Sequence, residues 1–225
     1  MASLAATISF TGKRALVTGA GSGIGREIVK SLIASNCEKV YALCKSNDVH
    51  QLSADHPDIV DVHQVDLTDW SAVGDILSRK VTRVDYVVNN AGIVDLQPVG
   101  AISQQNLESH FAVNVNAAVN VSQICAQKMI DLRQGSGSIV NVSSQASTVA
   151  LSGHLSYCAS KAALDAVTRV MALELGPHNI RVNSVRPTVT MTDMAVKAWS
   201  DPSKANIAKQ RIPLGRFAQP QVRFW

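Results

Sequence analysis

A tyrosine and a lysine stand four positions apart, at Tyr157 and Lys161, where the apolar spacing predicts a helix over Leu155–Leu175. Side chains four residues apart share one face of a helix. A cation beside a phenol favours the phenolate and lowers its pKa from about 10 toward the range of a working proton donor or acceptor. Tyr and Lys also meet at this spacing by chance in many helices. The pair alone is therefore weak evidence for proton chemistry.

Two serines follow an apolar run that has the composition of a buried strand. Ser143 and Ser144 come directly after Ile139–Val142. In parallel sheets, ligands bind at the carboxyl ends of the strands, so a hydroxyl group at this point would lie near a ligand. The serines strengthen the case that Tyr157 and Lys161 belong to a functional site.

A glycine-rich turn lies near the amino terminus, between a predicted strand and a predicted helix. Its sequence, TGAGSGIGR from Thr18 to Arg26, spaces Gly19, Gly23 and Gly25 as G-x-x-x-G-x-G. Glycines permit a tight turn and a close approach of backbone N–H groups to a pyrophosphate, and the helix dipole favours the phosphate charge. A purely structural loop is the alternative. The position between strand and helix favours dinucleotide binding.

The end of the second predicted strand bears on which dinucleotide binds. An acidic residue about 20 positions after the glycine motif would bind the adenosine ribose of NAD, whereas a cation there accommodates a 2′-phosphate. This chain has Lys45 at that point, 20 positions after Gly25, and no acidic residue from Val40 to Asn47. A solvated lysine at a strand end is the alternative. The pattern favours NADP(H) over NAD(H).

Short Val- and Ile-rich runs alternate with longer amphipathic segments, which is the pattern of a parallel sheet with crossover helices. The predicted strands are Arg14–Thr18, Lys39–Cys44, Val60–Val65, Asp85–Asn89, Ser138–Val142 and Arg181–Arg186. The predicted helices are Ile24–Ala34, Trp70–Leu77, Gln104–Leu132 with a break near His110, and Leu155–Leu175, which Gly176-Pro177 ends. The expected fold is a single doubly wound, Rossmann-type α/β domain over residues 1–225.

Composition sets the broad class of the protein. The 225 residues are 46% hydrophobic and carry 21 Lys and Arg against 17 Asp and Glu, a net charge of +4, which excludes intrinsic disorder and collagen. No apolar run reaches about 18 residues and no basic segment precedes the first apolar stretch, so we expect no membrane span or signal peptide. The four cysteines form no C-x-x-C pair, which argues against disulfides and a metal site. The basic excess gathers after Asp201, so no nucleic-acid partner is expected. These features predict a soluble cytoplasmic protein.

Taken together, the motifs resemble those of the short-chain dehydrogenase/reductase family. The matching pieces are Thr18–Gly25, Asn89–Gly92 (NNAG), Asn114, Ser144 and Tyr157–Lys161 (YCASK). The resemblance extends from about residue 10 to about Ala218 and is highly specific as a set. It implies a Rossmann-type fold and an oxidoreductase that uses a nicotinamide dinucleotide.

The resemblance implies a role for each matching side chain. Tyr157 is expected to be the general acid when a carbonyl is reduced, and the base in reverse. Lys161 is expected to bind the nicotinamide ribose and to depress the Tyr157 pKa. Ser144, thirteen residues before Tyr157, is expected to orient the carbonyl oxygen in preference to Ser143, and Asn114 to hold the water through which protons reach Lys161. Hydroxyl donors aimed at the developing oxyanion stabilise it by roughly 3 kcal/mol each.

Further cofactor contacts are implied around the glycine turn and after the later strands. Asp66, followed by Leu67, matches the aspartate that contacts adenine, and Pro187, Val189 and Thr192 match residues that contact the carboxamide. The residues expected to bind NADP(H) are Gly19, Ser22, Gly23, Ile24, Gly25, Lys45, Asp66, Leu67, Asn90, Gly92, Tyr157, Lys161, Pro187, Val189 and Thr192.

A narrower resemblance, to members that reduce L-xylulose and α-dicarbonyl compounds, rests on Asn141–Gln145, Met171–His178 and Trp199–Pro202. It implies that NADPH reduces such a small carbonyl or sugar substrate, with xylitol oxidised in reverse. The residues expected around the substrate are Ser144, Gln145, Leu151, His154, Tyr157 and Trp199, the last on a lid. Two alternatives stay open: a carbonyl reductase for other ketones, and an inactive variant that binds cofactor or partners.

Two features depart from the family pattern. Ser22 stands in the glycine turn where related chains often carry a basic residue, so Lys45, with Arg26, is expected to hold the 2′-phosphate. The family continues with another helix and a seventh strand, whereas this sequence ends at Trp225. We therefore expect an open edge at the sixth strand. The homotetramer that the family implies would lack the contribution of the seventh strand.

Overall fold

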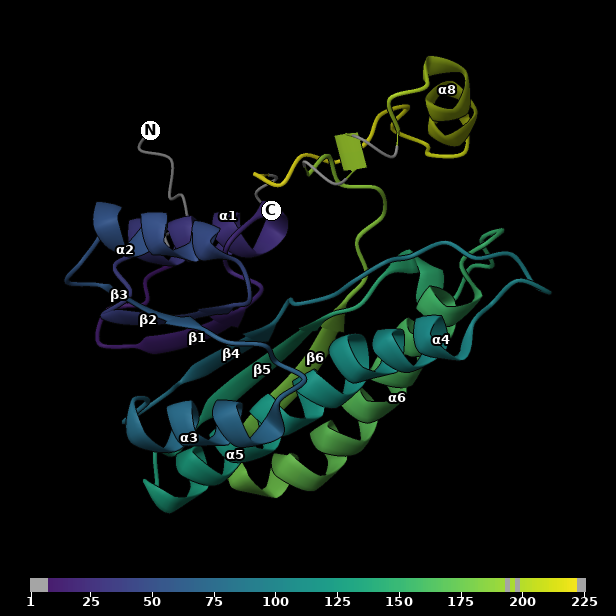
Figure 1. The fold of residues 1–225 in the computed structure, drawn as a ribbon. Helices are drawn as coiled ribbons and strands as arrows, with labels where there is room; N and C mark the ends of the chain where they lie inside the picture. Colours follow the sequence, from purple (N-terminus) through teal and green to yellow (C-terminus); the bar gives the residue numbers. More distant parts are fainter. Residues whose placement is uncertain (1–7, 193–194, 197–198, 222–225) are drawn as a thin grey trace.

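A computed structural model describes residues 8–192, 195–196 and 199–221 of the chain. The end of the sequence at Val222–Trp225 and most of the first apolar stretch lie outside the described residues. Helices cover both faces of a central sheet, and a separate arm bearing α8 projects beyond one end of the strands (Figure 1). Within the described part of the chain, no helix is long and apolar enough to cross a membrane.

The sheet has six strands in the order β3-β2-β1-β4-β5-β6, and all neighbouring pairs are parallel. The strands are β1 (Arg14–Thr18), β2 (Lys39–Cys44), β3 (Val60–Gln64), β4 (Tyr86–Asn89), β5 (Gly137–Val142) and β6 (Ile180–Val185). The order reverses between β1 and β4, and the crevice at such a reversal is where open α/β sheets bind ligands. The Rossmann-type fold and the six parallel strands expected from the sequence are confirmed.

The helices are α1 (Gly23–Ala34), α2 (His50–Asp55), α3 (Trp70–Arg79), α4 (Gln104–Phe111), α5 (Ala117–Asp131), α6 (Leu155–Leu175) and α8 (Pro202–Gln210). Short polar side chains begin several of them, because they satisfy N–H groups that lack helical partners. Asp69 accepts from Ala72 N at the start of α3, and Ser103 accepts from Asn106 N at the start of α4.

Each face of the sheet carries its own hydrophobic core. Val29 and Leu32 of α1, with Leu52 of α2, pack on β1, β2 and β3. On the other face α3, α5 and α6 pack on the sheet, with fully buried side chains such as Leu77 and Cys125. Strands covered on both faces read as nearly continuous apolar runs. This is why the sequence predicts β1 and β2 to the residue.

The sequence predicts the elements less well where packing overrides local pattern. The helix expected over Gln104–Leu132 is divided by a π-helical segment, Ala112–Asn116, just after the break expected near His110. The short helix α2 was missed because its six residues are mostly polar. The four cysteines are free as expected; Cys37 and Cys125 are buried, and Cys44 and Cys158 are partly exposed.

Beyond β6 the chain forms the arm that carries α8. Its own small cluster holds it together: the rings of Trp199 and Phe217 lie 5.2 Å apart, and Thr190 pairs with Ala218 as an isolated β-bridge. Among the residues that the structure describes, no strand pairs with the outer side of β6, as the sequence led us to expect.

Candidate active site and cofactor cavity

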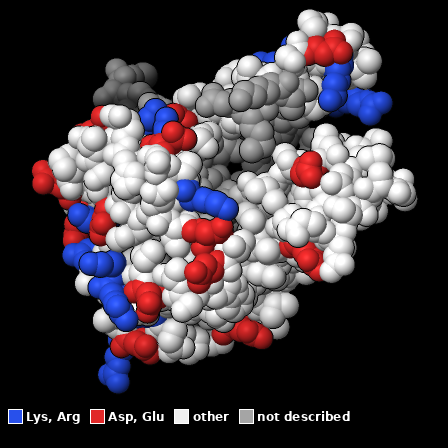
Figure 2. Space-filling view, viewed as in Figure 1, with Lys and Arg blue, Asp and Glu red and all other residues white. Residues whose placement is uncertain are grey.

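A cavity of about 750 Å³ opens at the carboxyl ends of the strands, at the point where the strand order reverses. Figure 2 shows the surface hollowed on the side from which the α8 arm projects. Among the residues predicted to bind the cofactor, those that line this cavity are Gly19, Ser22, Gly23, Ile24, Lys45, Asp66, Leu67, Asn90, Gly92 and Thr192. Gly25, Tyr157, Lys161, Pro187 and Val189 do not line it.

The glycine turn has the conformation that its glycines permit. Gly19 and Gly23 adopt φ values of +62° and +52°, which side chains other than glycine rarely adopt. At Gly25 a Cβ atom would run into the carbonyl oxygen of Gly19 and the amide of Asn90. The Ser22 side chain does not cap α1, whose first residues, Gly23 and Ile24, line the cavity, so that end of the helix has N–H groups available for a ligand.

The loop after β4 is tied directly to the glycine turn. The Asn90 side chain donates to the carbonyl oxygens of Thr18 and Gly19, each at 3.1 Å. The Thr18 hydroxyl accepts from the backbone N–H groups of Asn90 and Ala91, also at 3.1 Å. These four hydrogen bonds hold the two walls of the cavity at a fixed separation. Asn90 thus supports the turn from behind as well as lining the cavity.

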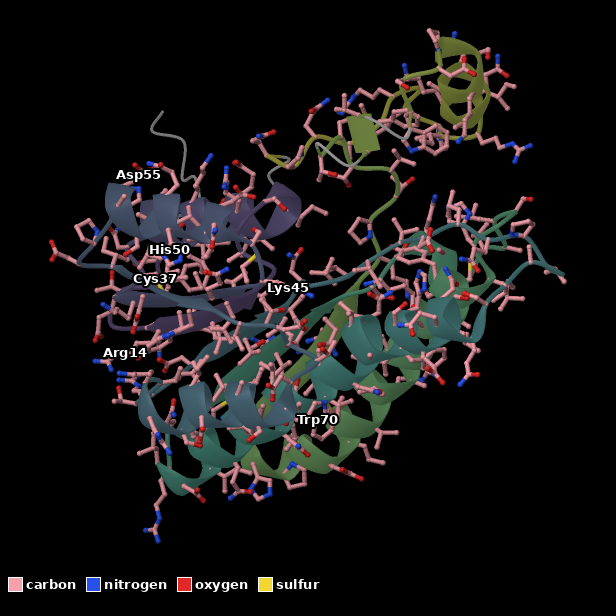
Figure 3. The ribbon with its side chains drawn as sticks, in the orientation of Figure 1. Arg14, Cys37, Lys45, His50, Asp55 and Trp70 are labelled. Carbon is pink, nitrogen blue, oxygen red and sulfur yellow. The ribbon has the colours of Figure 1, made fainter. Side chains whose placement is uncertain are left out.

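Lys45 and Asp66, which the sequence assigns to separate parts of the cofactor, form an ion pair. Lys45 Nζ lies 2.7 Å from Asp66 Oδ2, and Thr68 donates its N–H and hydroxyl to Asp66 Oδ1 at 3.0 and 2.8 Å. The hydrogen bond from Lys45, followed by those from Thr68, lowers the pKa of Asp66 to about 2. Figure 3 shows Lys45 just beyond β2, at the opposite end of the sheet from Arg14, which begins β1.

Arg26, the second cation expected near a 2′-phosphate, is bound to the short helical turn that follows Lys45. Its guanidinium donates to the carbonyl oxygen of Asp48 at 3.1 Å. Arg26 is also absent from the cavity lining. The positive charge that lines the cavity beside the glycine turn therefore comes from Lys45.

Tyr157 and Lys161 share one face of α6, beside the end of β5. Lys161 Nζ lies 5.8 Å from the centre of the Tyr157 ring and donates to the carbonyl oxygen of Val142 at 2.8 Å. Lys161 is only 4% exposed, and this burial lowers its pKa to about 8, against a smaller opposing effect of Asp165. A buried amine beside a phenol is the kind of arrangement that can move a proton.

The pKa of Tyr157 moves in the opposite direction from the expectation. Burial raises the pKa above its usual value of 10, and the Ser144 side chain opposes that change without cancelling it. The expected depression by Lys161 does not appear, because its ammonium group is bound to Val142 rather than to the phenolic oxygen. Tyr157 therefore holds its proton firmly at neutral pH.

The two candidate serines face different groups. Ser144 interacts with the Tyr157 phenol and accepts from Ala146 N at 3.1 Å. Ser143 instead donates to the backbone carbonyl of Lys161 at 3.3 Å. Of the two hydroxyl groups, that of Ser144 is the one beside the phenol.

An ion pair between the buried Asp165 and the exposed Arg186 supports the same helix one turn beyond Lys161. Arg186 Nε donates to Asp165 Oδ2 at 2.8 Å, and the Asp165 side chain is 5% exposed. Burial alone would raise the pKa of Asp165, but serine hydroxyl groups and the Arg186 guanidinium lower it overall. The carboxylate is therefore charged and adds a negative potential beneath Lys161.

Asn114, in the π-helical segment, forms hydrogen bonds with protein groups through both its amide oxygen and its amide nitrogen. Its Oδ1 accepts from Ile93 N at 2.8 Å, and its Nδ2 donates to Ile93 O at 3.1 Å and to Ser160 Oγ at 3.0 Å. A Cβ atom at Gly92 would lie 3.3 Å from Asn114 Oδ1 and 3.4 Å from Lys161 Nζ. Gly92 thus lets Asn114 and Lys161 approach the same point of the cavity wall.

The residues expected around a substrate lie in two places. His154 stands beside Tyr157, with ring centres 6.3 Å apart, and its Nδ1 contacts the carbonyl oxygen of Ser152 at 2.7 Å. Gln145 begins the short turn after Ser144, and the Leu151 carbonyl accepts from His154 N at 3.1 Å. Trp199 lies in the arm instead.

Within the arm, Trp199 packs on Phe217 under Lys204, whose Nζ is 5.1 Å from the ring centre. Pro187, Val189 and Thr192, the residues expected to contact the carboxamide, lie where the chain leaves β6 and enters the arm. The Pro187 carbonyl accepts from Gln145 N at 3.0 Å, and the Val189 carbonyl accepts from Ala218 N at 3.0 Å. Thr192 lies against Gly23, where a Cβ atom would come within 2.8 Å of its methyl group.

Sequence reasoning missed one wall of the cavity. Its further lining residues come from β2, the loops after β3 and β4, and α4 with its π-helical extension: Cys44, Thr68, Ala91, Ile93, Gln105, Glu108, Ser109, Ala112 and Val113. Apart from Ala91, which belongs to the NNAG motif, these residues lie in no motif that would indicate a ligand. The role of Thr18, whose hydroxyl group holds Asn90 and Ala91, could have been predicted because Thr18 is the first residue of the glycine-rich motif. Among the described residues, no group of three or more His, Cys, Asp or Glu side chains is placed to hold a metal ion.

Comparison with known proteins gives consistent matches. The chain matches the family model described as short chain dehydrogenase over residues 13–203. L-xylulose reductase from Bos taurus is 49% identical over 212 residues, which cover 94% of this chain and 86% of that protein. Carbonyl reductase (NADPH) 2 from Sus scrofa is 44% identical with the same coverage. A crystal structure described as an NAD(P) dependent gluconate 5-dehydrogenase from Beutenbergia cavernae, with NADP bound at low occupancy, is 31% identical, with a TM-score of 0.88 over 96% of this chain and 87% of that one.

Proposed function

Since the chain belongs to the short-chain dehydrogenase/reductase family, whose members are oxidoreductases, we propose that it reduces small polar carbonyl compounds with NADPH. The proposed substrates are L-xylulose and α-dicarbonyl compounds, and the reverse reaction oxidises xylitol. The observation that carries the proposal is the buried Lys161 ammonium group 5.8 Å from the Tyr157 ring, beside Ser144 and next to the cavity at the strand ends.

The cavity fits a dinucleotide on three grounds. Its volume of about 750 Å³ lies within the range of cofactor sites. The turn that opens it has glycines at positions where Cβ atoms would collide with the opposite wall. The first turn of α1 presents N–H groups without a side-chain cap, which suits a pyrophosphate. When bound there, the nicotinamide supplies the hydride, and the protein supplies position, proton and field.

Tyr157 is the proposed proton donor to the substrate oxygen. Because burial raises its pKa, the phenol is protonated at neutral pH and ready to donate as negative charge develops on that oxygen. Ser144, beside the phenol, is the second proposed donor to the same oxygen. Lys161 is proposed to bind the nicotinamide ribose and, as a cation, to stabilise the tyrosinate left after proton transfer. The reverse reaction needs the tyrosinate, so oxidation is expected to be favoured at higher pH.

The choice of NADP(H) rests on Lys45. Its ion pair with Asp66 is exposed, with 79% of the Lys45 side chain accessible, and such pairs contribute only about 0–1 kcal/mol. Lys45 can therefore turn from Asp66 to a 2′-phosphate at small cost. The NADPH named for the pig relative and the NADP bound in the bacterial structure support this choice. Replacing Lys45 by alanine should weaken NADPH binding about tenfold while NADH affinity, the internal control, changes little.

A small polar substrate is favoured by the groups around Tyr157. The His154 ring lies beside the Tyr157 ring, and Gln145 directly follows Ser144; both side chains can form hydrogen bonds with a polar substrate. The 49% identity to L-xylulose reductase supports a ketose. Trp199 is proposed to cover the substrate from the arm, for which it would leave its present packing against Phe217.

The experiment that tests the proposal is turnover by the purified chain. L-xylulose, diacetyl and cyclohexanone are offered with NADPH or NADH, and xylitol with NADP⁺. We expect turnover of the first two substrates with NADPH. Turnover of cyclohexanone alone would favour a carbonyl reductase of other ketones. Cofactor binding without any turnover, by a chain that folds normally, would favour the inactive binding variant.

Localisation and assembly belong to the same proposal. A cytoplasmic homotetramer is expected from the family resemblance. Val170 and Leu173 on the outer face of α6 are 53% and 78% exposed, which leaves apolar area for contact with another copy. Size-exclusion chromatography with light scattering measures the assembly, and a monomer at micromolar concentration would contradict it.

A further inference from the structure

Three side chains on α4 and its π-helical extension hold the loop after β4 by its backbone. Asn114 bonds both the N–H and the carbonyl of Ile93, at 2.8 and 3.1 Å. His110 Nε2 accepts from Asp95 N at 3.1 Å. Asn106 Nδ2 donates to Asp95 Oδ2 at 2.8 Å and to Asp95 O at 3.3 Å. We call these three residues, spaced by four, the α4 ladder.

The π-helical segment keeps the ladder in line. In a regular α-helix a step of four residues overshoots a full turn by about 40°, so a row with this spacing drifts around the helix. The wider π-helical turn, which covers Ala112–Asn116, offsets much of that drift between His110 and Asn114. All three members of the ladder can therefore reach one extended stretch of loop.

His110 is the middle member and is fully buried, with 0% exposure. Because Asp95 donates its N–H to Nε2, that nitrogen carries no proton, and Nδ1 therefore carries the proton. The Nδ1–H group donates to the Asn106 carbonyl at 2.7 Å. The hydrogen bonds thus hold the imidazole in one tautomer, with both nitrogens satisfied.

The same imidazole contacts the proposed proton donor. The ring centres of His110 and Tyr157 lie 6.4 Å apart at 73°, an edge-to-face arrangement. The loop that His110 binds contains Ile93, which lines the cofactor cavity directly after Gly92. One buried side chain therefore touches both the loop at the cofactor cavity and the Tyr157 ring.

From these contacts we propose that His110 is a positioning residue that fixes the Ile93–Asp95 loop against the cofactor and orients Tyr157 for proton transfer. The proposal rests on the proposed function for its second half, because proton transfer has meaning only if the chain reduces a carbonyl. The first half concerns cofactor binding alone. The two halves of the proposal use different features of the imidazole: the Nε2 lone pair for the loop, and the aromatic ring contact for Tyr157.

Two variants separate these parts. His110→Gln places an amide oxygen near the position of Nε2, so it keeps the acceptor for Asp95 N–H and loses the aromatic contact. His110→Phe keeps the aromatic contact and loses the acceptor. His178→Phe, in an exposed turn after α6, is the matched control for the substitution itself. The measurements are the NADPH dissociation constant from fluorescence, hydrogen exchange of the Asp95 amide, and kcat at saturating NADPH.

The two variants are expected to affect different measurements. In His110→Phe the Asp95 amide should exchange at least about fivefold faster and the NADPH dissociation constant should rise about fivefold, with kcat nearly retained. In His110→Gln exchange and affinity should stay near wild type, while kcat falls roughly threefold.

The proposal is overturned if both variants change affinity and kcat in parallel, which is the behaviour of a merely structural histidine, or if neither changes. If His110→Phe does not fold, His110→Gln decides: loss of Asp95 protection in that variant refutes the acceptor role. If the wild-type chain reduces none of the substrates offered, the proposed function fails. Exchange and NADPH affinity then still decide the first half of the inference.

Discussion

Replacing Lys161 by methionine is expected to stabilise the protein while removing its catalysis. The Lys161 side chain is buried, and burial lowers its pKa from 10.5 to about 8. At about 1.4 kcal/mol per pH unit, that difference is about 3 kcal/mol against the charged form. Methionine has a similar length and no charge to bury. Losing the hydrogen bond to the Val142 carbonyl costs about 1 kcal/mol, so the variant should gain about 2 kcal/mol at pH 7.

The predicted stability difference between Lys161→Met and wild type changes with pH. Below pH 8 the folded and unfolded chains both keep the Lys161 proton, so wild type carries the full cost of the buried charge. Between about pH 8 and pH 10.5 the folded chain releases the proton and the unfolded chain keeps it, so wild-type stability rises with pH. The variant has no such gain, and its advantage should shrink over this range.

Urea unfolding of both proteins at pH 7.0 and pH 9.5, without cofactor, measures the two differences in free energy. Other titrating groups are common to both chains and cancel in the comparison. The reasoning is refuted if Lys161→Met is less stable than wild type at pH 7, or if its advantage does not shrink at pH 9.5.

Two further substitutions test the supports of the site. Gly25→Ala should lower the free energy of unfolding by about 2 kcal/mol and remove most NADPH affinity, because the added methyl group collides with the glycine turn and Asn90. Gly176→Ala is the control, because a methyl group there meets no atom within 4 Å. Equal thermal unfolding temperatures for the two variants would contradict this prediction. Arg186→Gln removes the partner of the buried Asp165 and should lower the free energy of unfolding by roughly 1–3 kcal/mol, and an unchanged urea midpoint would show that the serines alone satisfy that carboxylate.

The sequence predicts those parts of the fold and site that depend on local pattern. Apolar runs place β1 and β2 to the residue, because strands buried on both faces leave no freedom in residue type. The glycine turn is readable because Gly25 sits where any side chain would collide. The spacing of Tyr157 and Lys161 is readable because α6 is long and regular, which puts both on one face.

What depends on three-dimensional contacts could not be predicted. The ion pair between Lys45 and Asp66 joins residues that follow different strands and meet only because β2 pairs with β3. The raised pKa of Tyr157 reflects burial that the spacing to Lys161 does not report. In the sequence, His110 is an ordinary polar residue in a predicted helix. Its contact with Asp95 could not be predicted, because it depends on the course of a loop that carries no motif.

The most direct test of the central claim compares wild type with Tyr157→Phe in the reduction of diacetyl by NADPH. The account predicts that the variant binds NADPH within about twofold of wild type, since only a hydroxyl group is removed, while turnover falls by about a hundredfold or more. A Tyr157→Phe protein that reduces diacetyl at the wild-type rate would contradict the claim that this phenol delivers the proton.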